Sequence, residues 1–209
     1  PAALAASAQA LKASLQGGHV ITIQIPDAEQ AKTASVLEFC WEALGEAGFT
    51  RNDVVVSLGG GATTDLAGFV AATWLRGIKV IHVPTTLLAM VDAAIGGKTG
   101  IDLGPLKNQL GVFAHPKHIY VDPIFLGSLP PEEFLNGFAE MLKHALIYDE
   151  EYWEALIHVD SNEASHIAVF VKRSNEIKSE ITQQDPNEHS VRKKLNYGHT
   201  IGHAIESFF

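Results

Sequence analysis

The chain has 209 residues, of which 46% are hydrophobic and 19% are charged. These proportions are typical of a globular protein, and the length suits one large domain or two small ones. The formal net charge of −9 argues against a nucleic-acid-binding protein, because such proteins hold phosphate backbones with clustered Lys and Arg.

Cys40 is the only cysteine, so no disulfide can form within the chain. It lies in an apolar helical pattern, and we interpret it as a core thiol of a cytoplasmic protein rather than as a nucleophile. The longest apolar stretches are interrupted by Asp65, Arg76 and Asp92. None reaches the roughly 20 residues of a membrane span, so we expect neither a membrane segment nor a signal peptide.

The first part of the chain alternates between helical and strand patterns. Helices are expected over residues 3–15, 29–47, 65–75 and 86–93. Strands are expected over residues 19–25, 53–58, 79–83 and 119–121. Strands that alternate with helices predict a parallel sheet, so the sequence indicates an α/β domain over residues 1–128.

The strand patterns stop after Pro130 and Pro131. Helices are predicted over residues 132–148, 151–157, 163–184 and 192–208. We therefore place a domain boundary near Leu129 and expect an all-α domain over residues 129–209. Because Phe208 and Phe209 resemble the interior of a helix, we expect this domain to be incomplete at its C-terminus.

Two motifs follow predicted strands. Gly59, Gly60 and Gly61 lie between a buried strand and a helix start, where glycines let a backbone approach a pyrophosphate. The alternative is a tight turn that needs positive φ angles. Thr85 and Thr86 follow the next strand, and they are interpreted equally well as ligand-binding hydroxyls or as a helix N-cap.

Residues 96–99 read Gly-Gly-Lys-Thr and are similar to the end of a P-loop. Asp92, however, occupies the place of the first P-loop glycine, and a carboxylate there would repel a phosphate. We therefore exclude an NTPase. Together with Lys107 and Asn108, Lys98 predicts a flexible loop that binds a phosphate or another anion, and the alternative is a solvated loop.

The predicted helical domain carries two further patterns. Glu140 and Lys143 share a helix face at i, i+3, which predicts either a surface ion pair or part of a site. His199 and His203 share a face at i, i+4, a spacing that can present two imidazoles to one site. With the Glu140 carboxylate, such imidazoles are compatible with a metal site of zinc type.

In this order, these segments resemble the 3-dehydroquinate synthase family from Ile25 to Phe209. The resemblance implies a Rossmann-like N-terminal domain and a helical C-terminal domain, with the active site between them. It also implies the shikimate-pathway conversion of 3-deoxy-D-arabino-heptulosonate 7-phosphate, a small sugar phosphate, to 3-dehydroquinate and phosphate. Catalytic NAD, a divalent metal (zinc or cobalt) and a homodimer are implied as well.

The resemblance assigns roles to three sets of residues. NAD would be held by Asp27, Glu29, Lys32, Gly60, Gly61, Thr64, Asp65, Thr85, Thr86, Lys98, Lys107, Phe125 and Ser128. The substrate would be met by Asp92, Lys98, Asn108, Lys143, Lys178, Arg192, Asn196 and His203, and by Arg76 from a neighbouring subunit. Among these, His203 would move the proton of the C5 hydroxyl, and Arg192 with Lys178 would pair with the C1 carboxylate. The metal would be bound by Glu140 and His199.

The sequence also departs from the family pattern. Ala62-Thr63-Thr64 replaces a common Val-x-Gly, and Leu106 replaces a common Gly. The first strand of the NAD-binding domain and a second histidine ligand are expected outside this sequence, so we expect little activity from these 209 residues alone.

Three other functions remain open. They are another sugar phosphate cyclase, of inosose or valiolone type, a metal-dependent alcohol or glycerol dehydrogenase, and an NAD-binding regulatory remnant. Arg192 and Lys178 favour a carboxylate-bearing substrate, whereas the lysines of the anion loop argue against a dehydrogenase.

Overall fold

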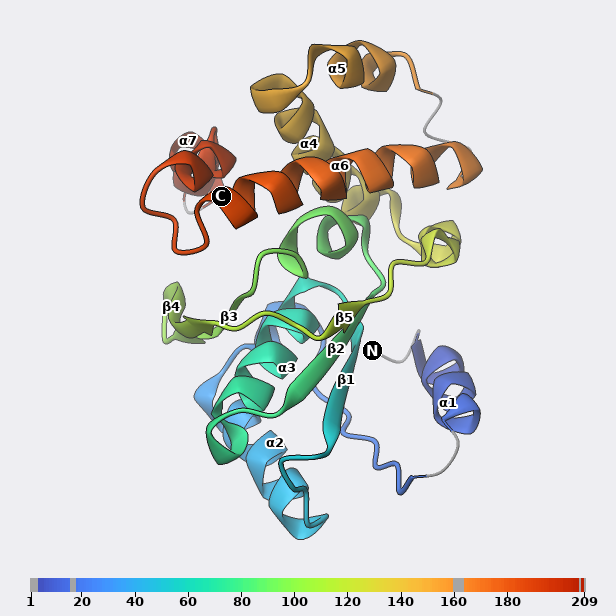
Figure 1. Ribbon diagram of the computed structural model, residues 1–209, viewed down its shortest axis with the longest axis vertical. Coiled ribbons are helices and arrows are strands. Elements are labelled where there is room, and N and C mark those ends of the chain that lie inside the picture. The colour runs from blue at the N-terminus through green and yellow to red at the C-terminus, as the bar shows by residue number, and fades with distance from the viewer. Residues whose placement is uncertain (1–3, 16–17, 160–163, 207, 209) are drawn as a thin grey trace.

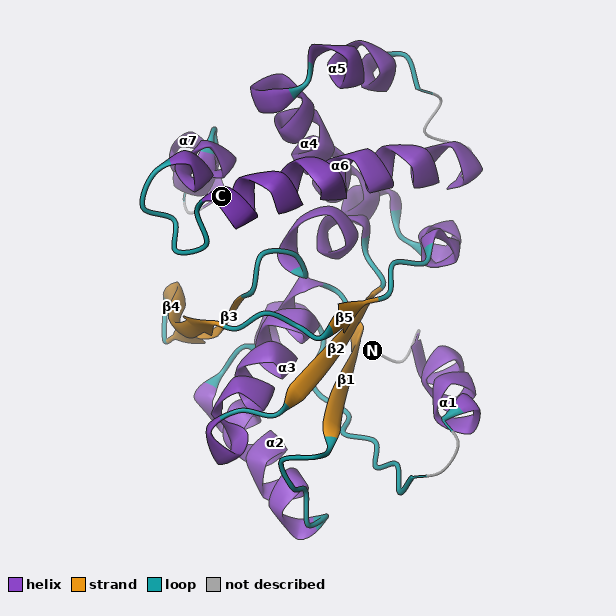
Figure 2. Ribbon diagram, viewed as in Figure 1, coloured by secondary structure: helices purple, strands orange, loops and turns teal. Residues whose placement is uncertain are grey.

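The computed structural model describes residues 4–15, 18–159, 164–206 and 208. A small sheet lies in the middle of the molecule, and most of the helices of the second half gather at one end of it (Figure 1). The parallel strands point toward this helical end, as Figure 2 shows. The carboxyl edge of the sheet, where open α/β sheets bind ligands, therefore faces the helices.

The sheet has the order β1-β2-β5, with β1 at Val54–Gly59, β2 at Lys79–Pro84 and β5 at His118–Ile119. All pairs are parallel, and Ser57 lies opposite His82. Helix α3 (Gly61–Thr73) and the short helix η3 (Trp74–Arg76) connect β1 to β2. The predicted α/β architecture with a parallel sheet is confirmed.

The N-terminal part differs from the prediction in two places. Helix α1 covers Ala5–Ser14, but the strand predicted over residues 19–25 is wrong, because residues 18–26 contain no strand. An alternating segment forms a strand only where a neighbour supplies hydrogen bonds, and none of the described strands pairs with it. The predicted helix over residues 29–47 is divided into η2 (Ala28–Ala31) and α2 (Ala34–Glu46), because Thr33 is extended and caps α2.

The predicted flexible loop after Gly97 is a β-hairpin. Strand β3 (Lys98–Leu103) pairs antiparallel with β4 (Leu106–Phe113) around Gly104, which has a φ of 57°. The backbones of the two strands approach closely, and a Cβ atom at Gly111 would lie 2.1 Å from the Thr99 carbonyl oxygen. The prediction of a loop is therefore wrong, because the lysines lie on paired strands.

The helical end confirms three predicted helices. They are α4 (Pro131–Tyr148), α5 (Glu150–Ile157) and α6 (Ala164–Gln184), preceded by η5 (Pro123–Ser128). The single helix predicted over residues 192–208 is instead divided into η6 (Val191–Asn196) and α7 (His199–Glu206). Gly198, with a φ of 83°, separates them. No helix within the described ranges is long and apolar enough to cross a membrane.

A short π-helix, η4 (Ala89–Ala93), packs between the two halves of the molecule. Met90 and Val91 are fully buried and share one hydrophobic core with Met141 of α4 and Ile177 of α6. A second core lies between α2, α3 and β3, around Leu44 and Leu66. Because η4 is packed between the sheet and the helices, Asp92 at its end has a fixed position between them.

Candidate active site

The glycine motif turns from β1 into α3 without positive φ angles. Gly60 is the N-cap, with a φ of −77°, so a turn that needs left-handed glycines is not the explanation. The glycines are instead explained by close packing. A Cβ atom at Gly60 would lie 3.1 Å from the Thr86 methyl group, and one at Gly59 would lie 2.5 Å from the Thr63 hydroxyl. Thr86 also accepts a hydrogen bond from the Ala89 amide at 3.2 Å, which supports the N-cap interpretation.

Lys32 gathers several residues predicted to bind the cofactor. Its buried ammonium donates to Asp65 at 3.1 Å and to the amide oxygen of Asn108, and it lies 3.3 Å from Glu29. Burial disfavours the charge on Lys32, but Asp65 and Glu29 outweigh it and raise the lysine pKa. Burial also raises the pKa of Asp65 to about 6, although Lys32 opposes the shift.

A second cluster surrounds Asp92. Burial would raise the pKa of Asp92, but the ammonium groups of Lys178 and Lys143 outweigh burial and lower it. Lys178 comes from α6 and donates to Asp92 Oδ1 at 2.6 Å and to the Asp92 carbonyl oxygen at 2.5 Å. Burial in turn lowers the pKa of Lys178, against the attraction of Asp92. The two groups thus form an ion pair between η4 and α6, in which Lys178 is buried and Asp92 is partly exposed.

Glu140 lies beside this ion pair on α4. Its Oε2 accepts from Lys143, and its Oε1 lies 3.7 Å from Nε2 of His199. The structure therefore brings together both residues that were predicted to bind a metal. The side chain of His203, predicted one helical turn after His199, lies outside the described part of the structure.

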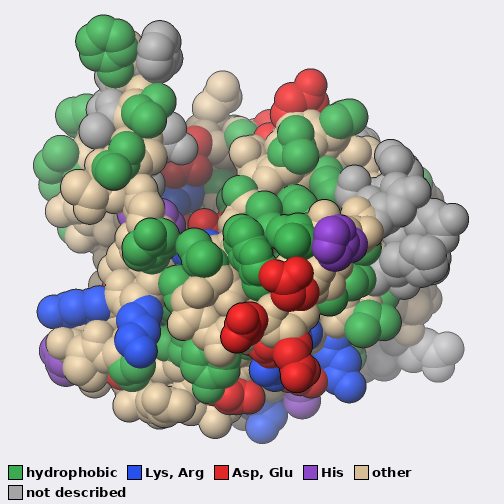
Figure 3. All heavy atoms as spheres, turned by 90° about the horizontal axis from the view of Figure 1, so that it is seen from above, with side chains coloured by type: hydrophobic (Ala, Val, Ile, Leu, Met, Phe, Trp, Pro, Cys, Tyr) green, Lys and Arg blue, Asp and Glu red, His purple; other side chains and the backbone are tan. Residues whose placement is uncertain are grey.

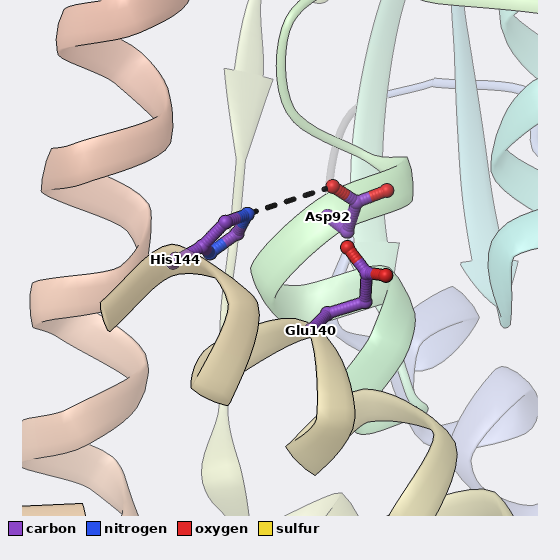
Figure 4. Close-up of side chains that lie close together, drawn as sticks. All are labelled: Asp92, Glu140 and His144. Atoms are coloured by element: carbon purple, nitrogen blue, oxygen red, sulfur yellow. Dashed lines mark ion pairs between the residues drawn. The ribbon is translucent and has the colours of Figure 1, made fainter. Parts of the chain in front are cut away.

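His144 completes the cluster, although it was not among the residues predicted from the sequence. Figure 4 shows its imidazole pointing from α4 toward Asp92, with Glu140 on the same helix. Single ligand atoms of Asp92, Glu140 and His144 lie within 4.8 Å of one another. The i, i+4 spacing of Glu140 and His144 was the signal available in the sequence.

These side chains fit a divalent metal. Carboxylate oxygens and imidazole nitrogens are ligands of zinc and cobalt, and Glu140 and His199 already lie next to each other. Nε2 of His144 faces the same cluster, 3.8 Å from Asp92 Oδ1, and is buried without a hydrogen-bond partner among the described residues. The Lys143 ammonium group forms an ion pair with Glu140, so a cation that binds Glu140 has to compete with this group.

Arg192 and Lys98 lie at another edge of the site. Arg192 is buried and donates to the carbonyl oxygens of Pro186 at 2.8 Å and Gly96 at 3.0 Å. Glu188, also missed from sequence, accepts from Asn196 at 2.6 Å and pairs with Lys98. Asp185 holds this loop, because its carboxylate accepts from the backbone amides of residues 189, 190 and 192.

Some predicted residues are not brought together. Lys98 pairs with Glu188 at one end of the hairpin, whereas Asn108 binds Lys32 near the other end, so no described contact joins them. Lys178 and Arg192, which were predicted to pair with the same carboxylate, have different partners: Lys178 binds Asp92, and Arg192 binds backbone carbonyl groups. The described contacts connect none of the following to either cluster: Thr64, Thr85, Arg76, Lys107, Phe125 and Ser128.

The surface has a hollow at the helical end. Figure 3 shows it between the lobe that carries α7 and the rest of the molecule, with acidic, basic and histidine side chains inside it. Glu140, Lys143 and His199 are the charged and histidine side chains that α4 and α7 place near each other. The arrangement can hold a cation and an anionic molecule in one place.

Comparison with known proteins gives the family. Residues 22–136 match "3-dehydroquinate synthase N-terminal", and residues 137–209 match "3-dehydroquinate synthase C-terminal". A 3-dehydroquinate synthase of Streptomyces coelicolor is 51% identical over 99% of this chain, which spans 58% of that relative's length.

Two solved structures are also similar. A 2-deoxy-scyllo-inosose synthase complexed with carbaglucose-6-phosphate, NAD⁺ and Co²⁺ is 28% identical, with a TM-score of 0.83, over 99% of this chain and 57% of that one. A 2-epi-5-epi-valiolone synthase of Streptomyces hygroscopicus subsp. jinggangensis, with NAD⁺ and Zn²⁺ bound, is 30% identical, with a TM-score of 0.74, over 84% and 51%. The family matches cover residues 22–209, and the chain therefore belongs to the 3-dehydroquinate synthase family.

Proposed function

We propose that the protein to which this chain belongs is a 3-dehydroquinate synthase, a phosphate-eliminating lyase that depends on NAD and a divalent metal. It converts 3-deoxy-D-arabino-heptulosonate 7-phosphate to 3-dehydroquinate and phosphate as a cytoplasmic homodimer. The observation that carries the proposal is the Asp92, Lys178, Glu140 and His199 cluster at the carboxyl edge of the sheet. Identity of about half the residues to proteins of that name supports it.

The two halves of the chain divide the work in this proposal. Residues 1–128 hold NAD, with the Lys32 and Asp65 cluster and the glycine turn beside it. Residues 129–209 supply Glu140 and His199 for the metal and most groups for the substrate. When bound, NAD supplies a hydride acceptor and the metal supplies a Lewis acid next to the substrate oxygens.

The chain's own groups bind and orient the substrate. The Asp92 carboxylate accepts hydrogen bonds from substrate hydroxyls, because carboxylates are strong acceptors. Lys178 and Arg192 attract the C1 carboxylate, and a guanidinium binds it with two parallel hydrogen bonds. His203 accepts the proton of the C5 hydroxyl, since an imidazole can take up a proton near neutral pH.

Another sugar phosphate cyclase is the second candidate, because inosose and valiolone synthases share the fold at 28–30% identity. Arg192 distinguishes the candidates, because the proposal pairs its buried guanidinium with a C1 carboxylate that substrates of the inosose and valiolone type lack. Two of its N–H groups bind carbonyl oxygens, and the guanidinium has further donors for a ligand.

The full-length protein tests the proposal. It is incubated with NAD, Zn²⁺ or Co²⁺ and either the heptulosonate phosphate or a carboxylate-free sugar phosphate, and phosphate release is measured. We expect turnover of the heptulosonate phosphate alone, and a fall in its kcat/KM of on the order of 100-fold in Arg192→Met, the loss of a charge-assisted contact. Turnover of only the carboxylate-free substrates would contradict the proposal.

A further inference from the structure

His144 carries a buried nitrogen that has no partner. The residue is fully inaccessible to solvent, and Nε2 is one of two buried side-chain polar atoms without a hydrogen bond among the described residues. A buried polar atom in this state has lost its hydration without compensation. The nearest charged acceptor is Asp92 Oδ1, at 3.8 Å, as the dashed line in Figure 4 marks.

Ser174 determines what Nε2 presents to Asp92. Nδ1 of His144 lies 2.7 Å from the Ser174 hydroxyl, on α6. The imidazole is neutral because it is fully buried, so it has one N–H group and one lone pair. When Ser174 donates to Nδ1, the proton is on Nε2 and faces the carboxylate. The opposite arrangement would direct a lone pair at a negative oxygen, which is unfavourable.

Lys178 keeps Asp92 from closing this gap. Its ammonium group holds Oδ1 at 2.6 Å and also binds the Asp92 carbonyl oxygen. The other charged groups near His144 are Lys143 on α4 and Glu140 one turn before it. In the proposed function, Lys178 attracts the substrate carboxylate, and a Lys178 that turns to this carboxylate leaves Asp92 without the ammonium group that now holds it.

We infer that His144 is a positioning residue, whose Nε2–H becomes a hydrogen-bond donor to Asp92 when Lys178 binds the anionic substrate. The carboxylate is thereby held in one orientation, in which its remaining lone pairs accept from the substrate hydroxyls. The inference rests on the proposed function for the step that displaces Lys178. It assigns His144 no contact with the substrate and no place among the metal ligands.

Nitrogen NMR on the ligand-free, full-length protein tests the contact itself. Histidine labelled with ¹⁵N is incorporated, and the His144 signals are assigned by their loss in His144→Gln. We expect a neutral ring with its proton on Nε2. A proton on Nδ1, or a shift of Nε2 on Zn²⁺ binding that shows direct coordination, would overturn the inference. This result is independent of whether the proposed reaction takes place.

Variants test the effect on the reaction. His144→Phe removes the donor, and we expect kcat to fall by about 10- to 100-fold, as for loss of a hydrogen bond to a charged group, with KM and Zn²⁺ affinity unchanged. His144→Gln restores an N–H donor and should recover most of kcat. An unchanged kcat in His144→Phe, or an equal loss in a folded His144→Gln protein, would contradict the positioning role.

His82 provides a matched control. It is also buried and also binds a serine hydroxyl through Nδ1, with Ser57 at 2.7 Å, but it lies on β2 within the sheet. His82→Gln should lower stability and leave kcat unchanged. If the full-length protein does not turn over the heptulosonate phosphate at all, the proposed function fails, and the NMR experiment still decides whether His144 faces Asp92 with a proton.

Discussion

At the scale of single residues, burial keeps two histidines neutral. Burial lowers the pKa of His82 to about 4 and that of His144 to about 3, although Asp92 raises the latter. The unfolded chain binds a proton at each imidazole near pH 6.5, whereas the folded chain does so only at lower pH. Both residues therefore stabilise the fold above pH 6.5, and this contribution is lost as the pH falls toward their folded-state values.

This gives a prediction for the pH dependence of stability. Between pH 6.5 and about 4, replacing His82 by Gln removes up to one proton from the uptake on unfolding. The slope of the free energy of unfolding against pH should then decrease by up to about 1.4 kcal/mol per pH unit. Urea unfolding of both proteins at several pH values measures the slope, and identical slopes would show that His82 is not a buried neutral base.

Glu140 gives a second prediction at this scale. Glu140→Gln removes the negative charge next to His199, so Zn²⁺ affinity should fall by more than the roughly 10- to 100-fold that loss of an outer hydrogen-bond partner costs. Competition with a chelator measures the affinity. Glu133→Gln, an exposed change in the first turn of the same helix, serves as the control and should bind Zn²⁺ normally.

At the scale of elements, the contact between η4 and α4 sets the geometry of the site. The two backbones approach at Gly137, where a Cβ atom would lie 2.4 Å from the Leu88 amide nitrogen. The approach holds Asp92 of η4 near Glu140 and His144 of α4. Side chains on two different elements thus keep their distances because a glycine allows the elements to touch.

Gly137→Ala should therefore separate η4 from α4. We expect a loss of about 1–3 kcal/mol in the free energy of unfolding, which is the usual cost of overpacking, together with weaker Zn²⁺ binding. Denaturant unfolding and Zn²⁺ titration measure the two effects. Gly127→Ala is the matched control, because no atom lies within 4 Å of its added Cβ. Equal behaviour of both variants would contradict the close approach.

At the scale of the whole molecule, local patterns predicted the elements that local residues determine. The sequence predicted strand β1, the glycine turn after it and helices α4 to α6. The strand predicted around Ile21 to Ile25 is absent, because the alternating isoleucines pack against the second core and the segment pairs with no described strand. The hairpin of β3 and β4 was not predicted, because the segment that contains Gly104 and Pro105 was interpreted as a loop.

The site could be predicted where a family pattern supplied it and not where only tertiary contact defines it. Glu140 and His199 were assigned together, and they lie 3.7 Å apart. The pairing of Lys32 with Asn108 and of Lys98 with Glu188 depends on where the hairpin ends lie, which no sequence spacing determines. The role of His144 depends on Ser174 and Asp92, from two other elements.

Anomalous diffraction at the cobalt edge, from crystals of the full-length protein with Co²⁺ and NAD, measures whether η4, α4 and α7 assemble one metal-dependent site at the carboxyl edge of the sheet. We predict one peak at roughly 2.0–2.2 Å from a Glu140 oxygen and a His199 nitrogen, with His144 uncoordinated. A peak that contacts neither Glu140 nor His199 would show that these elements do not form the metal site.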